Sequence, residues 1–277
     1  METLRDVAAT LRFPRFGDDE VTFSEAPKVT VVRDSDGSKL KSEAATTEVD
    51  AAGGDIKHWT VSLAGSQIPE VDLLTATWTD GSSTYRTEVE VVGGFVVSVA
   101  EIKDKLEEAP ENEEVRAKRE IALREIEGAC GVAFRPRYKR QLLDGSGTTR
   151  LILDQRQVTK VIGVEVEESA LTAEEIAELT IDPAGVLIRT TPWPSGKANI
   201  EVTYVHGYQS FAEAVLPVRD YAAYLLAGDP TDWNQRATSM SSDGATFALV
   251  TPGVRGARFP LPSVNGFVGQ YAEPLVR

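Results

Sequence analysis

Residues 112–228 constrain the fold more than any other stretch, because a helix, several strands and a second helix follow one another there. The first helix is predicted to begin at Asn112, an N-cap residue with acidic residues after it, and to end at Gly131. In the last helix, Pro217 lies where a helix start tolerates proline, and Gly228 is a stop signal. An apolar stripe follows one face of the first helix, and Thr172 is predicted to cap a short helix between the strands. Two helices that flank a β insertion indicate an α+β domain.

Four short motifs in this stretch carry a family resemblance. They are the Cys-Gly helix ending at 130–131, the Asp-Gly-Ser-Gly turn at 144–147, Trp-Pro-Ser-Gly at 193–196, and the strand Val-Thr-Tyr-Val-His-Gly-Tyr at 202–208. In this order, the motifs resemble those of the head-to-tail connector (adaptor) proteins from the neck of long-tailed double-stranded DNA bacteriophages. The resemblance covers about the second half of the chain.

The resemblance implies a structural virion protein. Such subunits would form a ring of about twelve copies that meets the portal protein and a tail or stopper protein, and that extends the DNA channel. The chain would assemble in the host cytoplasm and lie in the neck between capsid and tail. Neither an enzymatic activity nor a cofactor is implied.

Residues 1–100 are predicted to form an added all-β domain that smaller connectors lack. Apolar and polar residues alternate around Trp59, Trp78 and Val89, and turns rich in Gly and Asp separate these runs. Alternation with a period of two residues is typical of an antiparallel sandwich, which we interpret as immunoglobulin-like. A single cysteine, Cys130, excludes a disulfide within it.

A charged linker is predicted at residues 101–111, and an extended C-terminal arm at 229–277. The linker reads as solvated, although its acidic residues could instead line a channel. Repeated Pro and Gly residues argue against a helix or a long strand in the arm, but large apolar residues persist there. We therefore expect the arm to become ordered only on a partner, through four partner-binding residues: Phe259, Leu261, Phe267 and Tyr271.

The net charge of −14 argues against general DNA binding, which needs Lys and Arg to neutralise phosphates. DNA is therefore expected to pass the protein without specific binding. One basic patch contains Arg135, Arg137, Lys139 and Arg140, with aromatic residues between them. It could contact nucleic acid, but complementary charge favours a subunit contact with acidic residues such as those at 111–114 of a neighbour.

Catalytic signals are poor. The chain has two histidines, His58 and His206, and neither has a partner at metal-ligand spacing. His206 reads as a hydrogen-bonded structural residue and Cys130 as a packed thiol. Asp34 and Asp36 resemble the start of a calcium loop that lacks its final Glu. The sequence therefore predicts no enzyme, metal or cofactor, and it has no apolar run long enough to span a bilayer and no signal-peptide pattern.

Two alternative functions remain open at this stage. A carbohydrate-binding or host-adhesion phage protein would use the sandwich as its binding module and would need an exposed aromatic platform, for which Trp59 and Trp78 are the candidates. A hydrolase of an unrecognised family would need a convergent polar pocket, which two histidines and one cysteine do little to supply.

Overall fold

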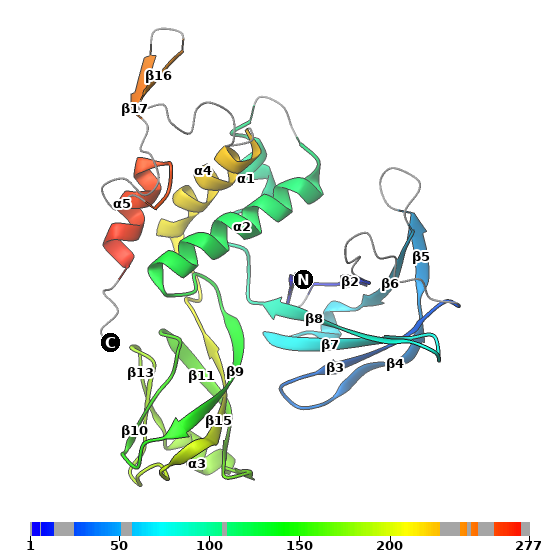
Figure 1. Ribbon diagram of the computed structural model, residues 1–277, viewed down its shortest axis with the longest axis vertical. Helices are drawn as coiled ribbons and strands as arrows, with labels where there is room; N and C mark the ends of the chain where they lie inside the picture. The colour runs from blue at the N-terminus through cyan, green and yellow to red at the C-terminus, as the bar shows by residue number, and fades with distance from the viewer. Residues whose placement is uncertain are drawn as a thin grey trace. The chain divides into compact units, whose positions relative to one another are not determined.

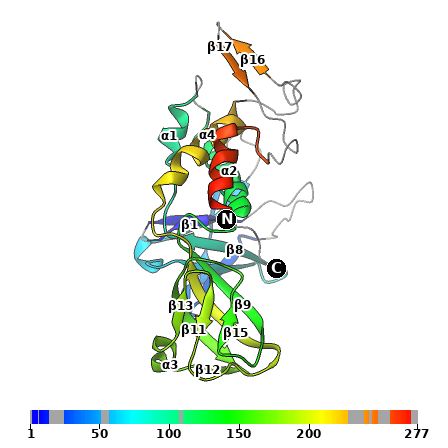
Figure 2. The same cartoon turned by 90° about the vertical axis from the view of Figure 1, so that its left-hand side faces the viewer.

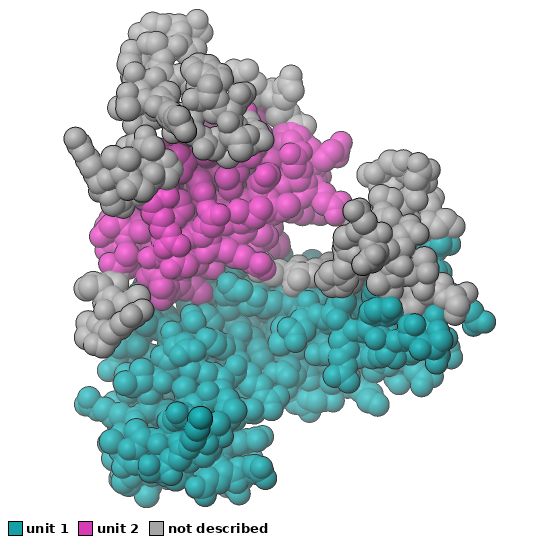
Figure 3. All heavy atoms as spheres, viewed as in Figure 1, with its two compact units in different colours: residues 1–94, 135–207 teal, residues 95–134, 208–277 magenta. Residues whose placement is uncertain are grey.

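The computed structural model describes residues 2–5, 7–13, 25–50, 57–106, 110–227, 239–242, 245–248 and 258–272. The chain divides into two compact units, coloured in Figure 3. Unit 1 comprises residues 1–94 and 135–207, and unit 2 comprises residues 95–134 and 208–277. The region 112–228 therefore contributes to both units: its strands and the short helix Ala173–Ala177 belong to unit 1, and its other helices belong to unit 2. The chain as a whole is rich in β-sheet, with a few helices and several separate sheets.

The first part of unit 1, here called the sandwich, contains two sheets (Figure 1). The larger sheet has the order β1-β8-β7-β3-β4 and the smaller one the order β2-β6-β5. Strand β1 pairs in parallel with β8, whereas the other pairs are antiparallel. The strands are β1 (Glu2–Leu4), β2 (Ala9–Arg12), β3 (Lys28–Arg33), β4 (Lys39–Ala45), β5 (Thr47–Asp50), β6 (Lys57–Leu63), β7 (Asp72–Thr79) and β8 (Thr84–Val92).

Alternating side chains from both sheets fill one apolar core in the sandwich. In β7, every second residue is buried, and Trp78 is fully enclosed beside Phe13. Leu11 and Leu63 reach the same core from the smaller sheet. The predicted alternation is therefore confirmed around Trp78, while an immunoglobulin-like topology stays a prediction. A short 3-10 turn, η1 (Gly65–Gln67), connects β6 to β7.

The second part of unit 1, here called the β insertion, spans residues 135–207 and also has two sheets. Their orders are β12-β11-β15-β9 and β10-β14-β13. The elements are β9 (Arg137–Gly145), β10 (Arg150–Ile152), β11 (Val158–Val166), β12 (Ser169–Ala170), α3 (Ala173–Ala177), β13 (Thr180–Asp182), β14 (Val186–Ile188) and β15 (Gly196–His206).

The β insertion has its own apolar core and a short helix at one end. Leu151 and Leu187 from one sheet meet Val202 from the other in this core. Helix α3 lies at the end of the insertion next to β12 (Figure 2). The helix start predicted from Thr172 is confirmed, because its hydroxyl accepts a hydrogen bond from the Glu175 amide.

Unit 2 is built from helices around one apolar core. Its helical elements are α1 (Val99–Lys103), α2 (Asn112–Cys130), η2 (Ala212–Ala214), α4 (Val215–Leu226) and α5 (Pro262–Tyr271); β16 (Ser239–Ser242) and β17 (Ala245–Ala248) form a hairpin. Helix α2 buries the apolar stripe predicted for it, and Gly131 ends it in the left-handed conformation. The cap at its start is Glu111, which precedes the predicted Asn112. None of the described helices is long and apolar enough to cross a membrane.

The predicted extended C-terminal arm is wrong for residues 262–271, which form α5. Pro262 lies in the first turn of α5, where the missing amide costs nothing. The Asn265 side chain accepts hydrogen bonds from the amides of Arg258 and Phe259 at 2.9 and 3.0 Å, which fixes the chain before the helix. The remaining parts of the predicted arm, apart from β16, β17 and 258–272, lie outside the described residues.

Candidate interaction surfaces

Two motifs that carry the family resemblance meet in the β insertion, although they are far apart in the sequence. Gly145, in the Asp-Gly-Ser-Gly turn at 144–147, is paired with Gly196, the last residue of the Trp-Pro-Ser-Gly motif. The amide of Gly145 donates to the Asn199 side chain at 2.8 Å, and the Trp193 amide donates to the Thr148 carbonyl at 2.7 Å. The two motifs therefore form one junction, which we call the turn junction.

The geometry of the turn junction explains why glycine and tryptophan occur at its central positions. A Cβ atom on Gly145 would lie 1.8 Å from the Pro194 carbonyl oxygen, so only glycine fits. Gly147 adopts a φ of 71°, which also favours glycine. The Trp193 ring is fully buried, and the Arg189 guanidinium lies 4.8 Å from its centroid. These motif residues therefore have a structural role in the β insertion.

The predicted basic patch lies on and just before β9, and its members differ in exposure. Arg135 is 2% exposed. Arg137 makes a forked contact with Glu90, with nitrogen–oxygen distances of 2.8 and 2.5 Å. Lys139 lies 3.1 Å from Asp154, and Arg140 lies 2.6 Å from Glu201 and 3.3 Å from Asp34.

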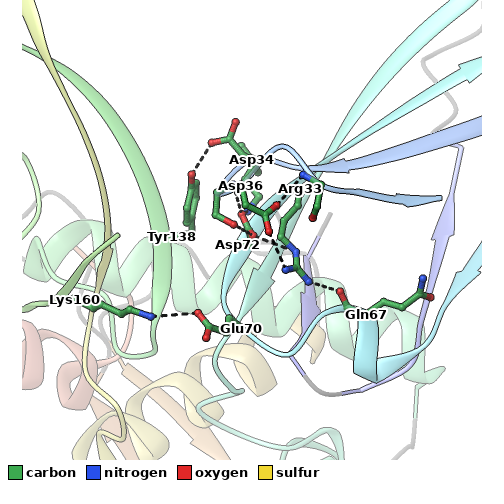
Figure 4. Close-up of polar contacts among 11 residues, drawn as sticks. Arg33, Asp34, Asp36, Gln67, Glu70, Asp72, Tyr138 and Lys160 are labelled. Atoms are coloured by element: carbon green, nitrogen blue, oxygen red, sulfur yellow. Dashed lines mark hydrogen bonds and ion pairs between the residues drawn. The ribbon is translucent and has the colours of Figure 1, made fainter. Parts of the chain in front are cut away.

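An acidic turn of the sandwich faces β9 and is held by hydrogen bonds. Tyr138 donates from its hydroxyl to Asp34 at 2.7 Å (Figure 4). The neighbouring Ser35 donates from its amide and its hydroxyl to the buried Asp72, which also lies 3.6 Å from Arg33. Burial raises the pKa of Asp72, although these hydrogen bonds oppose the rise. Asp34 is therefore presented to β9 from an anchored turn.

Three of the four basic residues expected to contact a neighbouring subunit, Arg137, Lys139 and Arg140, thus have acidic partners in their own chain. These partners are Glu90, Asp154, Glu201 and Asp34. A subunit contact through Arg137, Lys139 or Arg140 stays a prediction, and it would need these in-chain contacts to be shared or exchanged.

The four residues expected to bind a partner through the C-terminal arm lie in or against the core of unit 2. Phe259 is 2% exposed and packs edge-on against Tyr221, with ring centroids 5.2 Å apart. Phe267 is also buried, while Leu261 and Tyr271 are partly buried against the same cluster. A partner-binding role for these residues stays a prediction, and for Phe259 and Phe267 it would require their release from this core.

The candidate catalytic and metal residues do not converge on a site in the described part of the chain. No group of three or more His, Cys, Asp or Glu side chains there could hold a metal ion. Cys130 is buried in the helical core, and the side chain of His58 lies outside the described residues. Trp78 is fully buried and Trp59 packs partly against the same core, so these two residues do not form an exposed aromatic platform.

His206 ends β15 and is 6% exposed. Within the described residues, its buried Nδ1 atom has no hydrogen-bond partner, while the predicted hydrogen bond of this histidine stays a prediction for its other ring nitrogen. Burial, together with the charges of Arg137 and Lys139, lowers the pKa of His206 to about 4. Sequence reasoning missed this property because nothing in the local pattern shows how deeply a strand end is covered.

The depressed pKa of His206 predicts a loss of stability in mild acid. The unfolded chain takes up a proton near the ordinary pKa of about 6.5, while the folded chain does so only near 4. As the pH falls through this window, protonation of His206 therefore lowers the free energy of unfolding by about 3 kcal/mol. We expect His206→Gln to unfold with a flatter pH dependence between these values, measured by denaturant titration at several pH values. An unchanged slope would contradict this assignment.

Comparisons with known proteins give structural matches alone. No family model matches this chain, and no curated protein matches it. A chain from a structure described as "Virion of native gene transfer agent (GTA) particle" is similar to it, with 17% identity over 66% of this chain and 92% of that chain, at a TM-score of 0.45. Another similar chain comes from "Neck of empty GTA particle computed with C6 symmetry", with 16% identity over 53% of this chain and 82% of that chain, at a TM-score of 0.41.

Proposed function

We propose that this protein is a structural subunit of the neck of a tailed phage or phage-like particle. In this role, copies of the chain form a closed ring that joins the portal to the tail or stopper proteins and extends the DNA channel. In this role the protein contributes to particle assembly and keeps the DNA channel continuous, and it does not need to catalyse a reaction.

The observation that carries this proposal is the turn junction. The sequence resemblance to head-to-tail connectors rests on the motifs at 144–147 and 193–196, and these motifs pack against each other through Gly145 and Gly196. The residue types in these motifs are required by packing within the β insertion and not by a chemical reaction. The shared motifs therefore support a similarity in architecture between this chain and the connectors.

The charge of the chain suits a channel that DNA must pass. A net charge of −14 per subunit repels phosphates at distances up to about 8 Å in physiological salt. The basic residues of β9 form ion pairs with carboxylates of the same chain. They therefore do not form a surface of unpaired positive charge that would attract DNA.

Ring formation provides a direct test. The full-length protein, alone and mixed with the portal protein encoded in the same genome, should give closed rings in negative-stain electron microscopy and a matching discrete mass in native mass spectrometry. A protein that stays monomeric in both samples would argue against a ring subunit. Specific enzymatic turnover that is lost on replacing His206 or Cys130 would instead favour the hydrolase alternative.

A further inference from the structure

The sandwich and the β insertion belong to one unit but have separate apolar cores. The buried clusters of the two parts share no residue. The two parts approach each other closely at Gly93, whose amide donates to the Pro136 carbonyl at 3.0 Å. A Cβ atom on Gly93 would lie 2.6 Å from the Pro136 ring, so glycine is required for this approach. The chain leaves and re-enters unit 1 beside these two residues.

Away from Gly93 and Pro136, charged hydrogen bonds join the two parts. Asp34 accepts from Tyr138 at 2.7 Å and from Arg140 at 3.3 Å. Glu90 accepts hydrogen bonds from two nitrogens of the Arg137 guanidinium. The Arg137 and Glu90 side chains are only 22% and 16% exposed, respectively. We call these contacts of Asp34 and Glu90 with β9 the latch.

A further ion pair joins Lys160 to Glu70 at 3.4 Å (Figure 4). Both of its side chains are largely exposed, at 59% and 69%, so solvent screens it and it adds little. The forked Arg137–Glu90 pair is better shielded and geometrically specific, which makes it the stronger contact.

We propose that the sandwich is a hinged module, which pivots at Gly93 and Pro136 and is held against β9 by the latch. Two separate cores allow the parts to move without breaking either one. The carboxylates of Asp34 and Glu90 then determine whether the module is closed, and salt weakens that closure mainly at the more exposed Asp34–Arg140 pair. This inference concerns the single chain and does not depend on the proposed ring.

The test measures the distance between the two parts in the full-length protein. Spin labels are placed at two exposed positions, Arg86→Cys in β8 and Glu174→Cys in α3, while Cys130 is buried. Labelled protein is diluted with unlabelled protein so that only distances within one chain contribute. Pulsed dipolar spectroscopy then compares wild type, the double variant Asp34→Asn with Glu90→Gln, and the control Glu88→Gln.

In low salt, the wild type and the control should give one narrow distance distribution. Glu88 lies two residues before Glu90 on the same strand and is exposed, so its replacement controls for the loss of a charge. The double variant should show an open population at least about tenfold larger, as expected when charge-assisted hydrogen bonds are removed. Salt near 1 M should open the wild type in the same direction but to a smaller extent than the double variant, because the Arg137–Glu90 pair is largely shielded from solvent. The inference fails if the double variant keeps the narrow distribution, or if the wild type is already broad in low salt.

Discussion

Replacing Gly145 with alanine is expected to destabilise the β insertion by about 3 kcal/mol, the upper range for overpacking a close-packed site. The added methyl group would lie 1.8 Å from the Pro194 carbonyl oxygen, and backbone atoms cannot yield as a flexible side chain does. Amide exchange of β15 provides the measurement, because it reports on the insertion separately from the helical unit. We expect faster exchange in β15 and unchanged exchange in α2.

Gly163→Ala is the matched control for this variant. Gly163 lies in β11 of the same sheet, and a Cβ atom there would meet no heavy atom within 4 Å. Its replacement should leave exchange in β15 nearly unchanged. Equal effects of the two variants would show that general loss of glycine, and not the turn junction, is responsible.

Replacing Phe259 with alanine is expected to cost the helical unit about 3–5 kcal/mol, as is usual for a buried aromatic residue. Its ring packs against Tyr221 and is 2% exposed, so the substitution leaves a cavity between α4 and the segment that leads into α5. The free protein should also show protected amides in α5. The measurement is amide exchange of α2 and α5 in the variant and in wild type.

Leu216→Ala provides the comparison for this second variant. Leu216 lies on α4 of the same unit but is 57% exposed, so its loss should change stability by no more than about 0.5 kcal/mol. Rapid exchange throughout α5 in the wild-type protein would restore the view that this segment becomes ordered only on a partner.

Local patterns in the sequence predicted much of the secondary structure. The period-two alternation around Trp78, the apolar stripe of α2 and the capping box at Thr172 each depend on residues a few positions apart. Interactions of this kind are visible in a sequence because the same short spacing determines both the pattern and the structure.

The C-terminal helix was missed because its local signals oppose a helix. Pro262, Gly266 and Gly269 all lie within α5 or at its start. Proline is harmless in the first turn, and burial of Val264 and Phe267 offsets the low propensity of the two glycines. A tertiary contact thus overrode the local preference.

The candidate surfaces depend on contacts over long separations, which no local pattern contains. The sequence shows the basic residues of β9, but not that Glu90 and Asp34 lie opposite them. Likewise, the motifs at 144–147 and 193–196 were visible separately, whereas their meeting at Gly145 and Gly196 required the fold.

Deleting the gene for this chain from its genome is the most direct test of the proposed neck role. If the chain joins the portal to the tail, the deletion should yield heads and free tails that do not join, as seen by electron microscopy of the lysate. Supplying the wild-type chain from a plasmid should restore tailed particles, and the destabilised Gly145→Ala variant should restore fewer. Intact tailed particles in the absence of the chain would contradict the account.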